Sequence, residues 1–335
     1  MNLRRLLFFL LKVALSAGLL WLVVRRTDFG GVIQRLRHID WRWLLPGVLM
    51  GPIAVLLSAW RWNKLGLGLI GFGAAVRYTW IGLFFGSILP GLVGGDLAKG
   101  LSLAAKNPRA RDSRLPVSII VDKLVGFWVL VLVFVSVSLV ILAVKPSLLD
   151  GVRGAVWAAS ALAFAGLIAG VAVSKRQGSA WLNRVAPLVP LAPLRRVAAR
   201  IALAVGSYAG QGGLLAQAAG ISVVMHGLNA LALWFALRSL GVPASLWFAA
   251  MFYPLLSGLL ALPVSISGVG VRDAFSASMF TVFGLGAESG IAFSWLLLAM
   301  SAPNVLLGGG IQLYELFARD KAKPSNGTLN PDATA

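Results

Sequence analysis

The sequence contains no cysteine, only two histidines (His38 and His226), and charged residues at only 12% of its 335 positions. Without cysteine there is no disulfide framework, no thiolate metal site and no cysteine nucleophile. Two histidines disfavour a histidine-based zinc or haem site, so we expect neither a metal nor another cofactor. A water-soluble domain carries about a quarter charged residues, because its surface must face water. Since 59% of the residues are hydrophobic and the mean hydropathy is +0.86, we expect a bilayer to cover this surface.

Acidic residues are scarce: eleven stand against thirty lysines and arginines, for a formal net charge of +19. Such an excess suits either nucleic acid or the anionic cytoplasmic face of a membrane. Here the basic residues form short runs between apolar stretches, as expected for the cytoplasmic loops of a membrane protein. No soluble segment remains to bind nucleic acid. We therefore expect a multi-pass protein of the cytoplasmic (inner) membrane, with no nucleic-acid partner.

The apolar runs predict an all-α polytopic membrane protein of about eight transmembrane helices. A polar stretch from 320 to 335 is expected to be a disordered cytoplasmic tail, which leaves 1–319 as the transmembrane domain. The first apolar run is expected to be a retained helix, because Arg25 and Arg26 follow it without a signal-peptide cleavage pattern. The uninterrupted runs are 6–24, 44–60, 116–144, 155–173, 214–237 and 291–317, and the two interrupted ones are 74–97 and about 238–283.

Orientation follows from the basic loops at 99–114 and 175–200, which two helices separate and which therefore belong on the cytoplasmic side. Counting membrane crossings from these loops toward the C-terminus places the C-terminus in the cytoplasm. Counting crossings toward the N-terminus places that end in the cytoplasm too, provided that 74–97 is a re-entrant hairpin that enters and leaves by the same face. If that segment crosses fully, the N-terminus is outside. We prefer the hairpin.

Two similar motifs interrupt the apolar segments in opposite halves of the chain. The first reads LPGLVGGDLAK (89–99) and the second LPVSISGVGVR (262–272). Each has a proline, small residues four and five positions later, and a basic residue nine positions later. The expected hinges of these broken helices are Pro90, Gly94, Gly95, Pro263, Ser267 and Gly268.

Proline and clustered glycine free backbone groups from helical hydrogen bonds, which membrane proteins tolerate only inside protein or beside a wet cavity. Two such segments entering from opposite faces would form an inverted repeat, the arrangement that secondary transporters use for alternating access. The repeat halves would be about 44–144 and 214–317. The alternative is a chance match, since glycine and proline are common in membrane helices.

Several charges lie inside or beside the apolar segments. A charge at the bilayer centre costs about 2.5–3.5 kcal/mol even on the lenient insertion scale, so these residues should face one another or a cavity. Each is either part of a site or one partner of a structural salt bridge. Arg61, between Trp60 and Trp62, is either an interfacial anchor or a phosphate contact. The others are Asp96, Asp122, Lys123, Arg272 and Asp273.

Together, Arg61-Trp62, LPGLVGGDLAK, Asp122-Lys123 with Gly126, and PVSISGVGVRD resemble the lysylphosphatidylglycerol synthase transmembrane family, also called flippase-like. The likeness covers about residues 5–318. Members of that family fuse this membrane unit to a cytosolic domain that aminoacylates phosphatidylglycerol, and the membrane unit is held to move the product lipid to the outer leaflet. The resemblance implies the translocating unit here without the synthase domain. Lys123 stands where many members have arginine.

We therefore expect a lipid flippase rather than an enzyme. Arg61, Lys99, Lys123 and Arg272 would bind an anionic headgroup, whereas Asp96, Asp122 and Asp273 would balance those charges or contact a cationic one. The alternatives are a membrane-embedded transferase on lipid-linked substrates, with Asp96 or Asp122 as general base, and an accessory scaffold of an envelope-building complex. The expected partners are membrane lipids with a charged headgroup, with a second copy of the chain or a separate lipid-modifying enzyme as further candidates.

Overall fold

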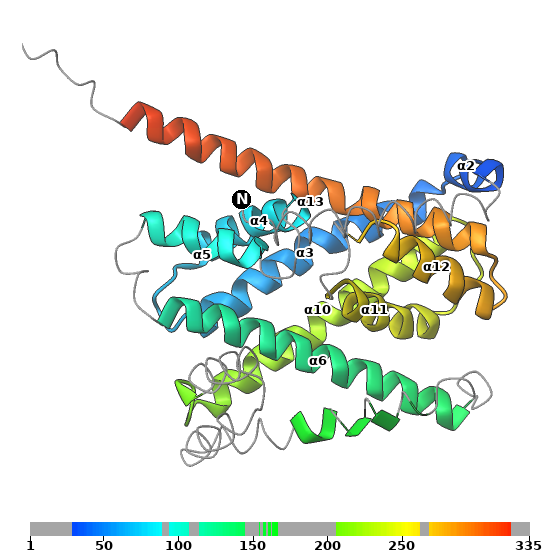
Figure 1. Ribbon diagram of the computed structural model, residues 1–335, viewed down its shortest axis with the longest axis horizontal. Coiled ribbons are helices and arrows are strands. Elements are labelled where there is room, and N and C mark those ends of the chain that lie inside the picture. Colours follow the sequence, from blue (N-terminus) through cyan, green and yellow to red (C-terminus); the bar gives the residue numbers. More distant parts are fainter. Residues whose placement is uncertain are drawn as a thin grey trace, which may run out of the picture.

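The computed structural model describes residues 29–88, 94–106, 114–144, 206–261 and 268–322, together with 154, 157, 158, 160, 161 and 163–166. The described residues are helical apart from turns and short connections (Figure 1). Four helices contain spans long and apolar enough to cross a bilayer. They are α3 (Trp41–Leu65), α6 (Arg114–Val144), α10 (Gly212–Ser239) and α13 (Ala287–Ala322). The protein is therefore an all-α multi-pass membrane protein, as predicted.

The centre of the fold is the antiparallel pair of α3 and α10, which pack along their whole lengths (Figure 1). At one end, Leu44 of α3 shares an apolar core with Leu237 of α10. At the other end, Leu65 of α3 packs with Ala218 of α10. The two helices approach closely at Gly47, where an added Cβ would lie 3.0 Å from the Phe235 side chain. Small residues permit this kind of close packing in membranes.

The first half of the chain adds a helical hairpin and one long helix to α3. Helix α4 (Phe72–Ile88) starts beside the C-terminal end of α3, and α5 (Gly94–Lys106) packs back along α4. Leu103 of α5 reaches the core formed by Ile70 and Tyr78, so this first hairpin (α4 and α5) returns to the end from which it starts. Helix α6 then runs antiparallel to α3, with Leu115 in the same core.

The second half repeats this order. After α10 come α11 (Leu246–Ala261) and α12 (Val271–Val282), which form the second hairpin, and then the long helix α13. Phe248 at the start of α11 contacts Phe280 and Phe283 at the end of α12, with ring centroids 5.5 and 5.1 Å apart. This hairpin therefore also returns to its starting end, which is the opposite end of the α3–α10 pair.

Each half packs on the hairpin of the other: α13 lies along α4, and α6 lies along α11. Figure 1 shows that α6 and α13, the last helices of the two halves, run in opposite directions, as α3 and α10 do. A short amphipathic helix, α2 (Phe29–Arg37), covers the end at which α13 begins, with Val32 fully buried in the core there.

The helix boundaries match most of the predicted ones within about four residues. Helix α13 continues to Ala322, so the predicted tail boundary at 320 falls within its last turn. The first apolar run, the loop at 175–200, and the residues Pro90, Pro263 and Ser267 lie outside the described residues, as does most of 155–173. The helices α4, α5, α11 and α12 are shorter than a full span, and the count of eight crossings stays a prediction.

Candidate functional site

A buried ion pair between α3 and α6 forms the centre of the candidate site. The Arg61 Nε donates to Asp122 Oδ1 at 2.7 Å, and each side chain is only 6% exposed. A second guanidinium nitrogen of Arg61 donates to the hydroxyl of Ser222 on α10 at 2.7 Å. Arg61 is therefore not an interfacial anchor. Its planar fork joins three helices, and the carboxylate neutralises a charge that the interior would otherwise exclude.

Gly126, one turn after Asp122 on α6, gives the guanidinium its space. A Cβ at this position would lie 3.0 Å from a terminal nitrogen of Arg61. The Gly126 carbonyl lies 3.0 Å from Nε2 of His226 on α10. The other ring nitrogen of His226 lies 2.9 Å from the hydroxyl of Tyr253 on α11.

Lys99 lies within α5 and is buried, rather than in the predicted basic loop. Its ammonium lies 3.6 Å from the ring centroid of Trp62, a cation–π contact. The Trp62 ring is held in turn, because its Nε1 donates to Ser118 on α6 at 3.2 Å. Lys99, the last residue of the first motif, therefore points into the protein and contacts Trp62, which directly follows Arg61.

The remaining pair of this region is partly open. Lys123 Nζ lies 3.1 Å from Asp96 Oδ2, and the two side chains are 54% and 18% exposed. Asp96 is in the first turn of α5, where the helix dipole favours a carboxylate. We call Arg61, Asp96, Lys99, Asp122 and Lys123 the first cluster. It holds three cations and two carboxylates. Its Arg61–Asp122 pair is buried, whereas its Lys123–Asp96 pair is partly exposed.

Arg272, Asp273 and Ser294 form a second cluster at the opposite hairpin. The Arg272 Nε donates to the Ser294 hydroxyl at 2.8 Å, and that hydroxyl donates to Asp273 Oδ1. The other carboxylate oxygen of Asp273 accepts from the Gly270 N–H at 2.9 Å, which caps the start of α12. Both oxygens of Asp273 are thus engaged, and its side chain is buried.

The predicted site residues therefore fall into two clusters. Within the described part of the chain, no ion pair joins the first cluster to the second. Among the predicted hinges, Gly94 begins α5, and Gly95 packs so closely on the Gly82 carbonyl of α4 that a Cβ would overlap it. Gly268 has φ +76°, a left-handed conformation that suits a hinge before α12.

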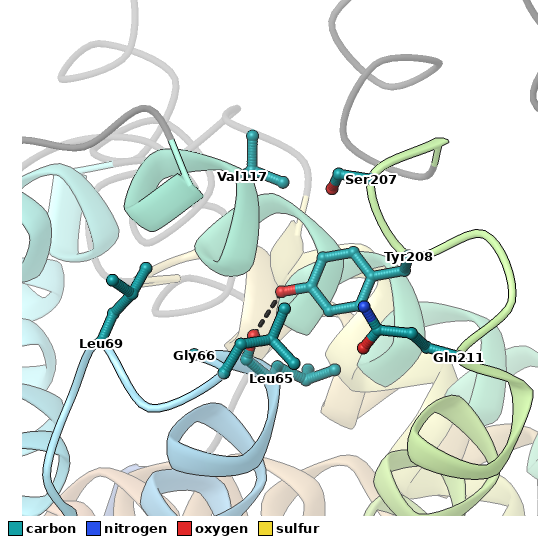
Figure 2. A pocket seen from close by; sticks show the side chains of 8 residues that line it. Leu65, Gly66, Leu69, Val117, Ser207, Tyr208 and Gln211 are labelled. Carbon is teal, nitrogen blue, oxygen red and sulfur yellow. Dashed lines mark hydrogen bonds between the residues drawn. The ribbon is translucent and has the colours of Figure 1, made fainter.

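A pocket of about 370 Å³ lies at the C-terminal end of α3 (Figure 2). Leu65 in its lining is one turn after Arg61 of the first cluster. The pocket is lined by Leu65, Gly66, Val117 and Gln211, among others, and the Tyr208 ring reaches across it to donate a hydrogen bond to the Leu65 carbonyl. Burial raises the pKa of Tyr208 to about 12, so its hydroxyl stays protonated and donates at neutral pH.

The side chains that hold these charges were not predicted from the sequence. Isolated serines and one histidine in apolar helices give no pattern, because a helix interior tolerates single polar residues that bond their own backbone. Ser222, for example, also donates to the Ala218 carbonyl one turn earlier at 2.8 Å. Only its position opposite Arg61 gives it a role, and that position depends on how α3 packs on α10. The missed residues are Ser118, Ser222, His226 and Ser294.

Comparison with known proteins identifies the family. No curated protein and no solved structure matches the chain. A family model described as the lysylphosphatidylglycerol synthase TM region matches residues 9–308, which contain α2 to α12 and most of α13. The resemblance noted from the motifs is confirmed, and it implies a role connected with membrane lipids. The chain belongs to the lysylphosphatidylglycerol synthase TM region family.

Proposed function

We propose that this protein moves a polar lipid with a charged headgroup between the two leaflets, and that the first cluster binds the headgroup. The observation that carries the proposal is the difference in exposure between the charged residues of that cluster. Lys123 and Asp96 are accessible, whereas Lys99, Arg61 and Asp122 lie buried behind them. A salt bridge that only joins two helices needs no accessible pair beside the buried one.

The three cations of the first cluster exceed its two carboxylates, which suits a phosphate. Lys99 supports this assignment most directly. Its ammonium lies over the Trp62 ring, and no carboxylate of the described residues is within ion-pair distance of it. A buried ammonium held mainly by an aromatic face keeps donors for a ligand oxygen. The exchangeable Lys123–Asp96 pair would open as the headgroup enters.

The arrangement of the two hairpins supports an inverted repeat and alternating access. The order of a long helix, a hairpin and a long helix occurs twice, the equivalent long helices run in opposite directions, and the hairpins start from opposite ends of α3 and α10. In transporters with inverted repeats, the two halves exchange conformations around a fixed site. The hairpins would open in turn to the two leaflets, with the end at the basic loop 99–114 facing the cytoplasm.

We assign the second cluster a different role from the first. The Nε of Arg272 and one oxygen of Asp273 are bonded to Ser294 of α13, and the other oxygen of Asp273 accepts from Gly270, so this cluster holds α12 against α13 rather than offering a vacant headgroup site. We therefore assign Asp273 a structural role rather than the predicted role in headgroup binding. Arg272 retains guanidinium nitrogens that can meet a phosphate in another conformation.

Reconstitution tests the proposal. The purified protein is placed in vesicles that contain a trace of fluorescent lipid, and leaflet exchange is followed with a membrane-impermeant quencher for anionic, zwitterionic and lysine-bearing headgroups. We expect exchange above that of empty vesicles for at least one headgroup, and a loss of tenfold or more in Lys99→Met. Arg42→Gln, an exposed cation of α3 at the opposite end, is the matched control and should retain activity. Exchange no faster than in empty vesicles for every headgroup would refute the proposal.

Two further measurements, one in the same vesicles and one in cells, distinguish transport from the other two functions. A transferase would change the mass of the labelled lipid when a donor lipid is supplied, which mass spectrometry detects. A scaffold would tolerate Asp96→Ala and Lys99→Met in cells without any defect in lipid distribution.

A further inference from the structure

His226 has a fixed protonation pattern that follows from its two partners. It is buried on α10, and Nε2 lies 3.0 Å from the Gly126 carbonyl. A carbonyl only accepts, so Nε2 carries the hydrogen. In the neutral ring Nδ1 is then an acceptor, and the Tyr253 hydroxyl, 2.9 Å away, donates to it. Adding a proton to Nδ1 would therefore force the Tyr253 hydroxyl to reverse its role.

These two partners belong to different functional parts. Gly126 packs directly on the guanidinium of Arg61, at the buried end of the first cluster. Tyr253 lies on α11 of the second hairpin, and its hydroxyl also hydrogen-bonds to Ser257 and Asn229. His226 thus connects the headgroup cluster of one half with the moving element that we assign to the other half.

Burial, together with the charge of Arg61, disfavours a proton on His226 unless an anion arrives. Arg61 faces it from α3, Asp122 on α6 is already paired with Arg61, and α11 contributes the neutral Tyr253. On α13, which also contacts α10, the acidic and basic residues lie at the two ends, at Glu288 and from Glu315 onward. On α10 itself the remaining charge is Arg238, three turns away. A headgroup phosphate in the first cluster would supply the missing negative charge.

We propose that His226 takes up a proton when an anionic headgroup occupies the first cluster, and that this proton repositions the second hairpin. This inference rests on the proposed transport function and specifies how it is coupled. The proton comes from water and binds Nδ1, which then donates to the Tyr253 oxygen. The Tyr253 hydrogen turns to an oxygen of Ser257 or Asn229, and no covalent bond other than N–H is made. The hydrogen bond between His226 and Tyr253 persists with its direction reversed, and the new orientation of the Tyr253 hydroxyl shifts α11 relative to α10.

The pH dependence of leaflet exchange is the first test. A single titrating group changes a rate by up to about tenfold per pH unit. We expect exchange of a fluorescent phosphatidylglycerol to rise at least fivefold between pH 7.5 and pH 5.5. In His226→Gln, which keeps a donor for Gly126 but does not titrate in this range, the rate should be independent of pH. His38→Gln replaces the other histidine of the chain, exposed beside α2, and should keep the wild-type profile.

The position of the second hairpin provides a readout that does not require transport. Because the chain has no cysteine, spin labels can be placed at Val282→Cys on α12 and Val140→Cys on α6, both exposed. In vesicles of anionic lipid, we expect the distance distribution between the labels to change from pH 7.5 to pH 5.5. The change should be absent in His226→Gln and in vesicles of neutral lipid.

The outcomes separate the two proposals. If wild-type protein moves no lipid but the labels respond to pH through His226, the transport function fails and the proton switch stands. If lipid moves at the same rate at both pH values, or if His226→Gln keeps the wild-type pH profile, the proton switch is wrong and the transport function stands. A distance distribution that is unchanged by pH in anionic vesicles would also overturn the switch.

Discussion

The two hairpin regions share their helical plan but differ in how they hold charge. In the first, five charged side chains form a graded cluster whose outer lysine is 54% exposed. In the second, the arginine and aspartate are buried and joined through one serine, and phenylalanine rings of α11, α12 and α13 pack on one another, with the Phe252 and Phe293 centroids 5.5 Å apart. A common scaffold can therefore carry a polar interior in one half and an aromatic one in the other.

The difference indicates which half is built to change its contacts. An ion pair with one exposed member costs little to open, because water can solvate both partners. A carboxylate whose two oxygens both accept buried hydrogen bonds, as in Asp273, is costly to uncover. We therefore expect the chemistry of recognition in the first half, and movement of the second hairpin largely as a unit.

The largest effect should come from removing one carboxylate from each region. Asp122→Ala leaves the buried guanidinium of Arg61 without its counter-ion and should lower the free energy of unfolding by about 3–5 kcal/mol. Asp273→Ala removes a helix cap and the acceptor of Ser294, at a cost of about 1–3 kcal/mol. Unfolding of the purified variants in detergent, followed by tryptophan fluorescence, compares them. Equal losses would contradict the distinction between the clusters.

An intermediate effect should follow from separating the helices of each hairpin region at a glycine. A Cβ at Gly95 would overlap the Gly82 carbonyl of α4, and one at Gly290 on α13 would lie 2.5 Å from the Ser276 carbonyl of α12. Backbone cannot yield as a side chain can, so Gly95→Ala and Gly290→Ala should each cost about 1–3 kcal/mol. The measurement is again unfolding in detergent.

The control for both glycine variants is Gly86→Ala, where the nearest atom, the Gly95 Cα, would lie 3.8 Å from the Cβ. This substitution should change the free energy of unfolding by less than about 0.5 kcal/mol, as ordinary substitutions away from tight packing do. If Gly95→Ala proves as mild as Gly86→Ala, the close contact between α4 and α5 is not needed for the hairpin.

The smallest effect on stability is expected for the exposed member of the first cluster. Lys123→Ala should change the free energy of unfolding by at most about 1 kcal/mol, because its pair with Asp96 is partly solvated. Leaflet exchange of an anionic lipid should nevertheless fall several-fold, and Lys123→Arg should retain it. A variant with full exchange would show that headgroups do not pass this pair.

Much of the fold followed from composition and periodicity. The boundaries of α6 and α10 were predicted within about two residues, because long apolar runs in a charge-poor chain have few alternatives to membrane helices. The two proline–glycine motifs also indicated the interrupted segments, since both residue types weaken a helix locally. Helices α5 and α12 begin inside those motifs, at Gly94 and Val271.

The partners of the charges were beyond prediction from the sequence. Asp122 and Lys123 are adjacent along α6, yet one pairs with Arg61 on α3 and the other with Asp96 on α5. Adjacent residues on a helix point about 100° apart, so a motif of neighbouring charges divides between two faces. Lys99 was misplaced in a loop for a related reason, because a basic residue after a glycine motif also fits a cytoplasmic turn.

The sequence by itself determined that this chain is a multi-pass helical membrane protein with two interrupted segments. Hydropathy, and the need of backbone N–H and C=O groups for hydrogen bonds within the bilayer, depend on the local sequence. Only the tertiary structure decided which charges meet. The antiparallel packing of α3 and α10 brings Ser222 to Arg61, and the contacts of α10 with α6 and α11 place His226 between the two halves. Such contacts join residues up to 161 positions apart, and their geometry depends on helix crossing and rotation that no single segment encodes.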